Sequence, residues 1–107
     1  MVEKRIKNVR AVLRNYRKKL EKKIVIKKMI LFGSYARGNP RDYSDIDVAV
    51  ISPDFQGGTQ RDYLLLDRTA REVTPFIEAF PYTPTDVKRR QRGGFLDEIL
   101  RKGKPII

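Results

Sequence analysis

Two acidic residues, separated by one position, stand at the start of an apolar segment and could bind metal ions. The segment Asp45-Ile46-Asp47-Val48-Ala49-Val50-Ile51 is rich in β-branched residues and ends at Ser52-Pro53, which predicts a β-strand. Because side chains alternate along a strand, Asp45 and Asp47 are expected on one face and Ile46 on the other. Two carboxylates on one face repel each other unless a cation lies between them, and Mg²⁺ prefers oxygen ligands. The pair favours one or two Mg²⁺ ions shared with a nucleotide, although acids facing water on a half-exposed strand would give the same pattern.

A Gly-Ser pair, with ten residues between it and the acidic pair, could bind phosphate. Lys28–Phe32 is predicted to be a strand that ends at Gly33, and a short helix could begin at Ser34. A helix N-terminus offers free N–H groups and a partial positive charge to a phosphate. Gly33 lets the backbone approach closely, Ser34 adds a hydroxyl donor, and Arg37 adds positive charge nearby. A capped turn between two core elements is the alternative for this pair taken alone.

Together the two motifs resemble those of the minimal nucleotidyltransferases of the polymerase-β-like superfamily. The family pattern is G-S, a spacer, then D-x-D or D-x-E, and this chain has it as Gly33-Ser34 and Asp45-x-Asp47. The longer pattern G-S-x-A-R-G…S-D-I-D also matches. It is typical of small stand-alone domains called MNT, many of which are antitoxins paired with HEPN ribonucleases. The resemblance implies an α+β nucleotidyltransferase fold, in which helices flank a small mixed β-sheet.

The superfamily also carries a third carboxylate on a later strand, and Glu78 is the candidate for it. Glu78 is the only acid within Pro75–Pro81, an apolar segment that its prolines mark as a short strand. Alternation puts Glu78 on the same face as two phenylalanines, which is unfavourable for a carboxylate without a partner. The family often has Asp here, and an edge-strand Glu that reaches solvent is the alternative. Glu72 and Asp86 are weaker candidates, because they fall in predicted helices.

The resemblance implies an enzyme that transfers AMP from ATP to a hydroxyl acceptor and releases pyrophosphate. The residues expected to be catalytic and to hold two Mg²⁺ ions are Asp45, Asp47 and Glu78. The residues expected to bind the ATP phosphates are Gly33, Ser34 and Arg37. Larger family members carry extra substrate-binding domains, for which 107 residues leave no room. We therefore expect another chain to present the acceptor, such as a tyrosine of a HEPN-type toxin.

Composition predicts one domain over residues 1–107, enough for a single core. Cysteine and histidine are absent, which excludes disulfides, thiol chemistry, His-ligated zinc and a histidine general base. No apolar run approaches the roughly 20 residues that span a bilayer, and the N-terminus does not resemble a signal peptide. We therefore expect a cytoplasmic protein with no membrane contact.

Positive charge is concentrated near the N-terminus. Residues 1–28 hold 12 of the 24 Lys and Arg residues and two acids, which accounts for +10 of the net charge of +11. Apolar residues recur there at helical spacing and predict one stripe that packs on the sheet: Ile6, Val9, Leu13, Tyr16 and Leu20. The outer face would be cationic and could attract nucleic acid or a protein, or it could simply be solvated. A protein partner is favoured over RNA, because Tyr16 belongs to the apolar stripe and this helix has no other aromatic residue that could stack on bases.

The other segments are predicted to be scaffold. Helices are expected over Arg61–Glu72, from Pro84 with Thr83 as N-cap, and over Phe95–Lys102 with Gly103 as C-cap. Two other functions remain open. One is a non-catalytic module that masks a partner protein or holds nucleic acid on its basic helix. The other is a nucleotidyltransferase that acts on small molecules, which normally needs a second domain.

Overall fold

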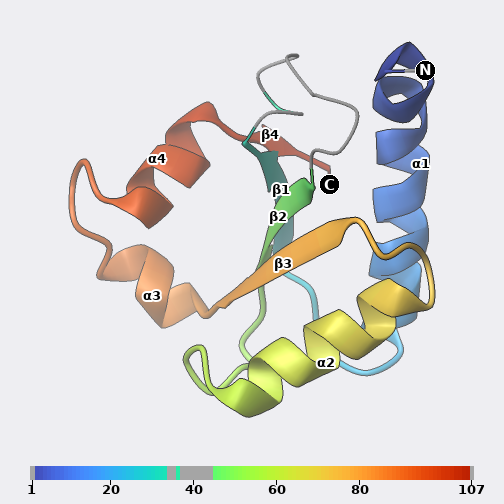
Figure 1. Ribbon diagram of the computed structural model, residues 1–107. Helices are drawn as coiled ribbons and strands as arrows, with labels where there is room; N and C mark the ends of the chain where they lie inside the picture. Colours follow the sequence, from blue (N-terminus) through green and yellow to red (C-terminus); the bar gives the residue numbers. More distant parts are fainter. Residues whose placement is uncertain (1, 34–35, 37–44, 107) are drawn as a thin grey trace.

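The computed structural model describes residues 2–33, 36 and 45–106, with side chains from Asn8 onward. The helices are α1 (Val2–Glu21), α2 (Gln60–Arg71), α3 (Pro84–Lys88) and α4 (Phe95–Lys102). The strands are β1 (Lys28–Phe32), β2 (Ile46–Ile51), β3 (Ile77–Tyr82) and β4 (Lys104–Pro105). Figure 1 shows the strands in the middle of the molecule, with α1 and α2 on one side and α3 and α4 on the other.

Within the described residues the strands form one mixed sheet in the order β3-β2-β1-β4. β1 pairs antiparallel with both β2 and β4, whereas β2 and β3 are parallel. The parallel pair requires a crossover connection, and α2 provides it (Figure 1). The predicted α+β fold with a small mixed sheet and flanking helices is therefore confirmed.

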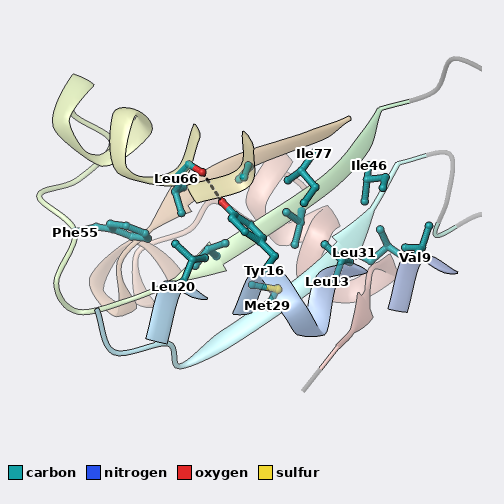
Figure 2. Packing of buried hydrophobic residues seen from close by; sticks show 14 residues of the cluster. Val9, Leu13, Tyr16, Leu20, Met29, Leu31, Ile46, Phe55, Leu66 and Ile77 are labelled. Atoms are coloured by element: carbon teal, nitrogen blue, oxygen red, sulfur yellow. Dashed lines mark hydrogen bonds between the residues drawn. The ribbon is translucent and has the colours of Figure 1, made fainter. Parts of the chain in front are cut away.

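The main core lies between the sheet and the helices α1 and α2. The apolar stripe of α1 is buried at Val9, Leu13, Tyr16 and Leu20, as predicted, and it faces buried residues of β1, β2 and β3 (Figure 2). The Tyr16 hydroxyl donates a hydrogen bond of 2.9 Å to the Leu66 carbonyl and so ties α1 to α2 (Figure 2). Burial, helped by the nearby Asp67 carboxylate, raises the pKa of the Tyr16 hydroxyl, so that it remains protonated. Tyr16 is thus a core residue.

A smaller apolar cluster covers the opposite face of the sheet. It consists of Ile30, Ala49, Ile51 and Ile99, with the last residue contributed by α4. At the end of α4, a Cβ on Gly103 would collide with the Ile30 side chain and would lie 3.0 Å from the Leu31 carbonyl oxygen. Glycine therefore lets this end of the helix lie directly against β1. The helix α4 and the short strand β4 that follows it are both fixed to β1 in this way.

Most predicted element boundaries agree with the structure. β1 and α4 have the predicted bounds, and α3 begins at Pro84 with Thr83 as its N-cap. β2 begins at Ile46, one residue later than predicted, because its pairing with β3 starts where the Ile46 N–H donates to the Phe76 carbonyl. α2 is displaced by one residue from Arg61–Glu72, and β3 begins two residues later than predicted and ends one residue later. β4 was not predicted, since two residues carry no periodicity.

Each edge strand of the sheet contains a proline. On the β3 side, the carbonyl of Phe76, just before the strand, accepts the Ile46 N–H, and the carbonyl of Tyr82 accepts the N–H of Ser52, just after β2. Because alternate residues of a strand face the same neighbour, the backbone of Pro81 faces away from β2. In β4, the N–H of Ile106 donates to the Met29 carbonyl, which directs the nitrogen of the preceding Pro105 away from β1. Neither proline removes a hydrogen bond of the sheet.

Candidate functional site

A row of side chains crosses the sheet where the sequence predicts the metal site. Phe32 of β1 is the register partner of Asp47 on β2, and Asp47 is the register partner of Glu78 on β3. Residues paired in this way on neighbouring strands project from the same face of a sheet and lie one strand spacing apart, about 4.8 Å. Two of the three predicted carboxylates, which are 31 positions apart in the sequence, are thus adjacent.

The face that carries this row is the one covered by α4. Ile46, Val48 and Val50 are buried on the α1 and α2 side, whereas Asp47 alternates with Ala49, which contacts α4 through the smaller cluster. The predicted alternation along β2 is therefore observed. Asp45 is exposed and immediately precedes the strand.

Gly33 lies directly against the Asp47 carboxylate. Its φ of +76° belongs to the left-handed region that favours glycine. A Cβ built on Gly33 would collide with Oδ2 of Asp47 and would lie 3.3 Å from its Cγ. Glycine is therefore required here for two reasons, and it brings the backbone at the end of β1 next to a carboxylate.

These residues line a pocket of about 570 Å³ between the sheet and α4. Its volume is within the range of sites that hold small-molecule ligands and cofactors. The sheet and the segment after β1 contribute Phe32, Gly33, Ala36, Asp47, Glu78 and Phe80. The helix α4 and its C-cap contribute Phe95, Glu98, Ile99, Lys102 and Gly103. Of the predicted site residues, Ser34 and Arg37 lie outside the described residues.

Comparison with known proteins identifies the family. A model of the family described as "Nucleotidyltransferase domain" matches residues 13–104, which is most of the chain and includes both predicted motifs. The chain belongs to this family. Its nucleotidyltransferase fold is also found in the crystal structure of a "putative nucleotidyltransferase" from Sulfolobus solfataricus. That structure superposes with a TM-score of 0.56 at 17% identity, over 82% of this chain and 75% of that one.

Sequence relatives of this nucleotidyltransferase domain occur in Methanocaldococcus jannaschii. Two of them, each named "Putative protein adenylyltransferase", are 38% and 43% identical to it over 47 residues. These matches cover 44% of this chain and 55% and 47% of the two relatives. The chain therefore spans about half the length of the relatives that it matches.

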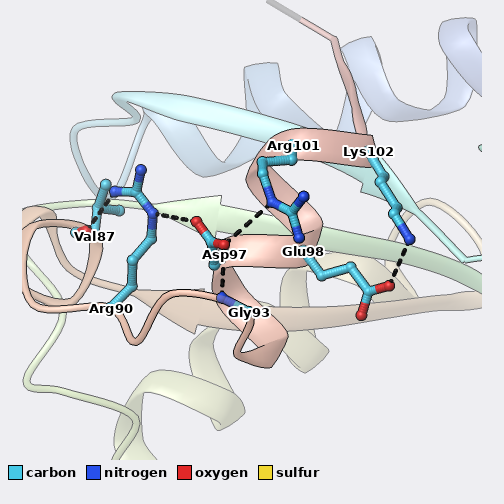
Figure 3. A network of polar contacts seen from close by, with 7 residues as sticks. All are labelled: Val87, Arg90, Gly93, Asp97, Glu98, Arg101 and Lys102. Atoms are coloured by element: carbon cyan, nitrogen blue, oxygen red, sulfur yellow. Dashed lines mark hydrogen bonds and ion pairs between the residues drawn. The ribbon is translucent and has the colours of Figure 1, made fainter.

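A buried carboxylate fixes the start of α4 in the nucleotidyltransferase domain. Asp97 accepts hydrogen bonds from the Gly93 N–H at 2.9 Å, from Arg90 Nε at 3.0 Å and from Arg101 Nε at 3.1 Å (Figure 3). The Gly93 N–H and the Arg90 side chain are the main causes that hold the pKa of Asp97 below its usual value, and burial opposes them. Together with the contact of Gly103 against β1, this network holds α4 over the pocket at both ends.

The carboxylates of the pocket fit a magnesium ion. Asp47 and Glu78 provide the hard oxygen ligands that Mg²⁺ prefers, and Mg²⁺ commonly binds one or two carboxylates together with water and substrate phosphates. In the described part of the chain, no three or more Asp, Glu, His or Cys side chains gather closely enough to form a complete metal site. Asp45 is therefore not gathered with Asp47 and Glu78 into one group, and it does not line the pocket.

The weaker acidic candidates have other contacts. Glu72, the C-cap of α2, forms ion pairs of 3.7 Å with Lys19 of α1 and with Lys23, which follows α1. The Asp86 carboxylate accepts the backbone N–H of Thr83 and caps α3. Neither acid lines the pocket. Among the described residues, no helix combines the length and the apolar character needed to cross a membrane.

Sequence reasoning missed the contribution of α4 to the pocket. It predicted the helix correctly but treated it as scaffold. The pocket residues Phe95, Glu98, Ile99 and Lys102 follow the spacing i, i+3, i+4 and i+7, which defines one helical face. That face mixes aromatic and charged residues, and this mixture was the available signal for a role beyond packing.

Proposed function

We propose that this domain transfers AMP from ATP to a hydroxyl group in a Mg²⁺-dependent reaction. The observation that carries the proposal is the adjacency of Asp47 and Glu78 in one pocket, with Gly33 against the Asp47 carboxylate. Membership of the nucleotidyltransferase family and the names of the relatives support it.

The proposed site has a metal-binding part and a phosphate-binding part. Asp45, Asp47 and Glu78 would hold two Mg²⁺ ions, which when bound would neutralise phosphate charge and lower the pKa of the attacking hydroxyl. Asp47 and Glu78 are already adjacent, and Asp45 would join them from the exposed end of β2. The β- and γ-phosphates would bind at Gly33 and Ser34, with Arg37 neutralising part of their charge.

The reaction is an in-line substitution at the α-phosphorus of ATP. The acceptor oxygen forms a bond to this phosphorus, and the bond from phosphorus to the oxygen bridging the α- and β-phosphates breaks. Pyrophosphate leaves with the electron pair of that bond. Glu78 would accept the proton of the hydroxyl, since an exposed carboxylate on an edge strand can reach an incoming acceptor.

We propose a protein as the acceptor, and specifically a tyrosine of a HEPN-type toxin. The names of the relatives specify transfer to a protein, and the MNT-type motif is typical of domains paired with HEPN proteins. The partner would be recognised in part by the exposed cationic residues of α1, which include Arg10, Arg14 and Lys18.

The alternative is a non-catalytic binding module, and the cationic surface of α1 is the feature that favours it. If α1 holds RNA, affinity should fall steeply as salt rises, because each neutralised phosphate releases counterions. Binding to a mixed RNA pool that persists near physiological salt, and is lost when Arg10 and Arg14 are changed to Ala, would favour this module over the enzyme–partner complex.

The direct test of the enzyme is calorimetric titration with ATP, with and without Mg²⁺, followed by a transfer assay with the co-purified partner. We expect tight binding only with Mg²⁺. Asp47→Asn should reduce transfer by at least about 10²–10³-fold, because it removes preorganised electrostatic stabilisation. Glu72→Gln is the matched control, since Glu72 lies outside the pocket. Equal ATP affinity with and without Mg²⁺ would contradict the proposal.

A further inference from the structure

The pocket has chemically different ends along α4. At the start of the helix Phe95 lines the pocket, and at its end Lys102 does so. Seven residues of helix separate the two by about 10 Å. Lys102 forms an ion pair of 2.9 Å with Glu98 on the same helical face (Figure 3). Beside Lys102, Gly103 lies against the Leu31 carbonyl, two residues before Gly33. The cationic end of α4 thus adjoins the proposed phosphate site.

Phenylalanine rings from β1, β3 and α4 form one wall of the pocket. The centroid of Phe32 lies 5.5 Å from that of Phe80 and 5.7 Å from that of Phe95, and Phe80 and Phe95 are 6.4 Å apart. Phe32 and Phe80 are half-buried. Phe32 is also the register partner of Asp47, and Phe80 is two residues from Glu78 on the same face of β3. The aromatic wall therefore adjoins the carboxylates.

Phe95 is far more exposed than a packing role requires. It is 59% exposed, whereas Ile99, one turn further along the same helical face, is 3% exposed. Both rings that Phe95 contacts lie nearly edge-on or tilted to it, at 84° and 66°. In such arrangements one ring presents an edge to the other, so Phe95 keeps exposed ring surface available to a planar ligand.

We propose that Phe95 stacks on the nucleobase of the nucleotide and is a substrate-positioning residue of this site. The inference rests on the proposed function, because the base is tethered through the ribose to the phosphates bound near Gly33. A nucleotide has an aromatic end and an anionic end, and α4 presents an aromatic residue and a cation in the same pocket. A protein acceptor has no such tether to the phosphate site. Asp97 positions the stacking ring, since it fixes the first turn of α4.

The test compares the affinities of ATP and of inorganic tripolyphosphate, which has no base, by calorimetry in Mg²⁺. Phe95→Ala should weaken ATP binding about tenfold or more, as expected for a lost base–aromatic stack, and should leave tripolyphosphate binding unchanged. Phe95→Tyr keeps the ring and should bind ATP as the wild type does. Phe76→Ala is the matched control, because Phe76 is 41% exposed but does not line the pocket.

The possible results distinguish a failure of the stacking role of Phe95 from a failure of the proposed nucleotide site. Unchanged ATP affinity in Phe95→Ala, or equal losses for ATP and tripolyphosphate, would overturn the stacking role. Unchanged ATP affinity with reduced transfer to a protein would assign the ring to the acceptor and would also overturn it. A wild-type protein that binds neither ligand would overturn the nucleotide site itself. Thermal unfolding of each variant, with a midpoint near that of the wild type, verifies that the fold is retained.

Discussion

Replacing Gly33 by Ala tests the geometry of the site most directly. The substitution adds one methyl group, which has two separable effects. A non-glycine residue in the left-handed region costs roughly 1–2 kcal/mol. The new Cβ would also collide with the Asp47 carboxylate, and restoring an ordinary contact requires that carboxylate to move by roughly 1 Å. The first effect lowers stability, and the second displaces a proposed metal ligand.

Gly58→Ala is the control, because it carries the backbone cost of the first effect without the collision that causes the second. Gly58 has a φ of +83°, close to the +76° of Gly33, but a Cβ at Gly58 would meet no atom within 4 Å. Both variants should lose comparable stability, with a fall in Tm of roughly 4–8 °C for each kcal/mol. Gly33→Ala alone should also reduce transfer, on the order of 10²-fold, since a displacement of about 1 Å in a reacting group can cost that much.

The assay is AMP transfer at a temperature where both variants are fully folded, together with calorimetric titration of Mg²⁺ and ATP. Circular dichroism through the thermal transition gives the stability of each variant. If Gly33→Ala transfers AMP as well as Gly58→Ala does, the Asp47 carboxylate is not held against the glycine backbone. The proposed arrangement of phosphate and metal sites would then be wrong.

Other substitutions test the third carboxylate, the support of α4 and the core. In the AMP-transfer assay, Glu78→Gln should abolish transfer, whereas Glu72→Gln should leave it intact. An active Glu78→Gln enzyme would mean that another residue is the third carboxylate. Asp97→Asn should destabilise the domain at pH 7. Because the pKa of Asp97 is lowered by folding, its contribution is present above about pH 4 and is lost as the pH falls through the folded pKa. Thermal melts should therefore show the wild type and Asp97→Asn converging in acid, and a constant difference would exclude this ionic role. Tyr16→Phe removes the hydrogen bond to Leu66 and should cost about 1 kcal/mol in chemical denaturation, whereas an unchanged free energy of unfolding would show that the bond contributes nothing.

Local sequence patterns were sufficient to predict the elements that carry the carboxylates. The alternation of acidic and apolar residues around Asp47 defined β2, and the prolines around Glu78 marked β3. Periodicity alone does not give the register between these strands. The pairing of Asp47 with Glu78 depends on where the crossover through α2 returns the chain to the sheet, which is a tertiary property.

The position of α4, which lines the pocket opposite the sheet, could not be predicted from the sequence for a similar reason. Phe95–Lys102 was correctly predicted as a helix, but its position over the sheet depends on contacts between distant residues. The three donors that surround Asp97 and the close contact of Gly103 with Ile30 fix that position. A capping glycine and an acidic residue in a first turn are common in helices, so neither residue type distinguishes this helix from an ordinary scaffold helix.

The prolines of the two edge strands limit how another protein can join this domain. An exposed sheet edge is normally a template on which a further strand can assemble through backbone hydrogen bonds. Here Pro81 interrupts the donor row along the outer edge of β3, and Pro105 does so along β4, which is only two residues long. Neither strand therefore offers a continuous backbone ladder for strand addition or for the growth of aggregates. A partner must instead recognise side chains, and the chemistry of the exposed residues, more than the sheet edge, sets its specificity.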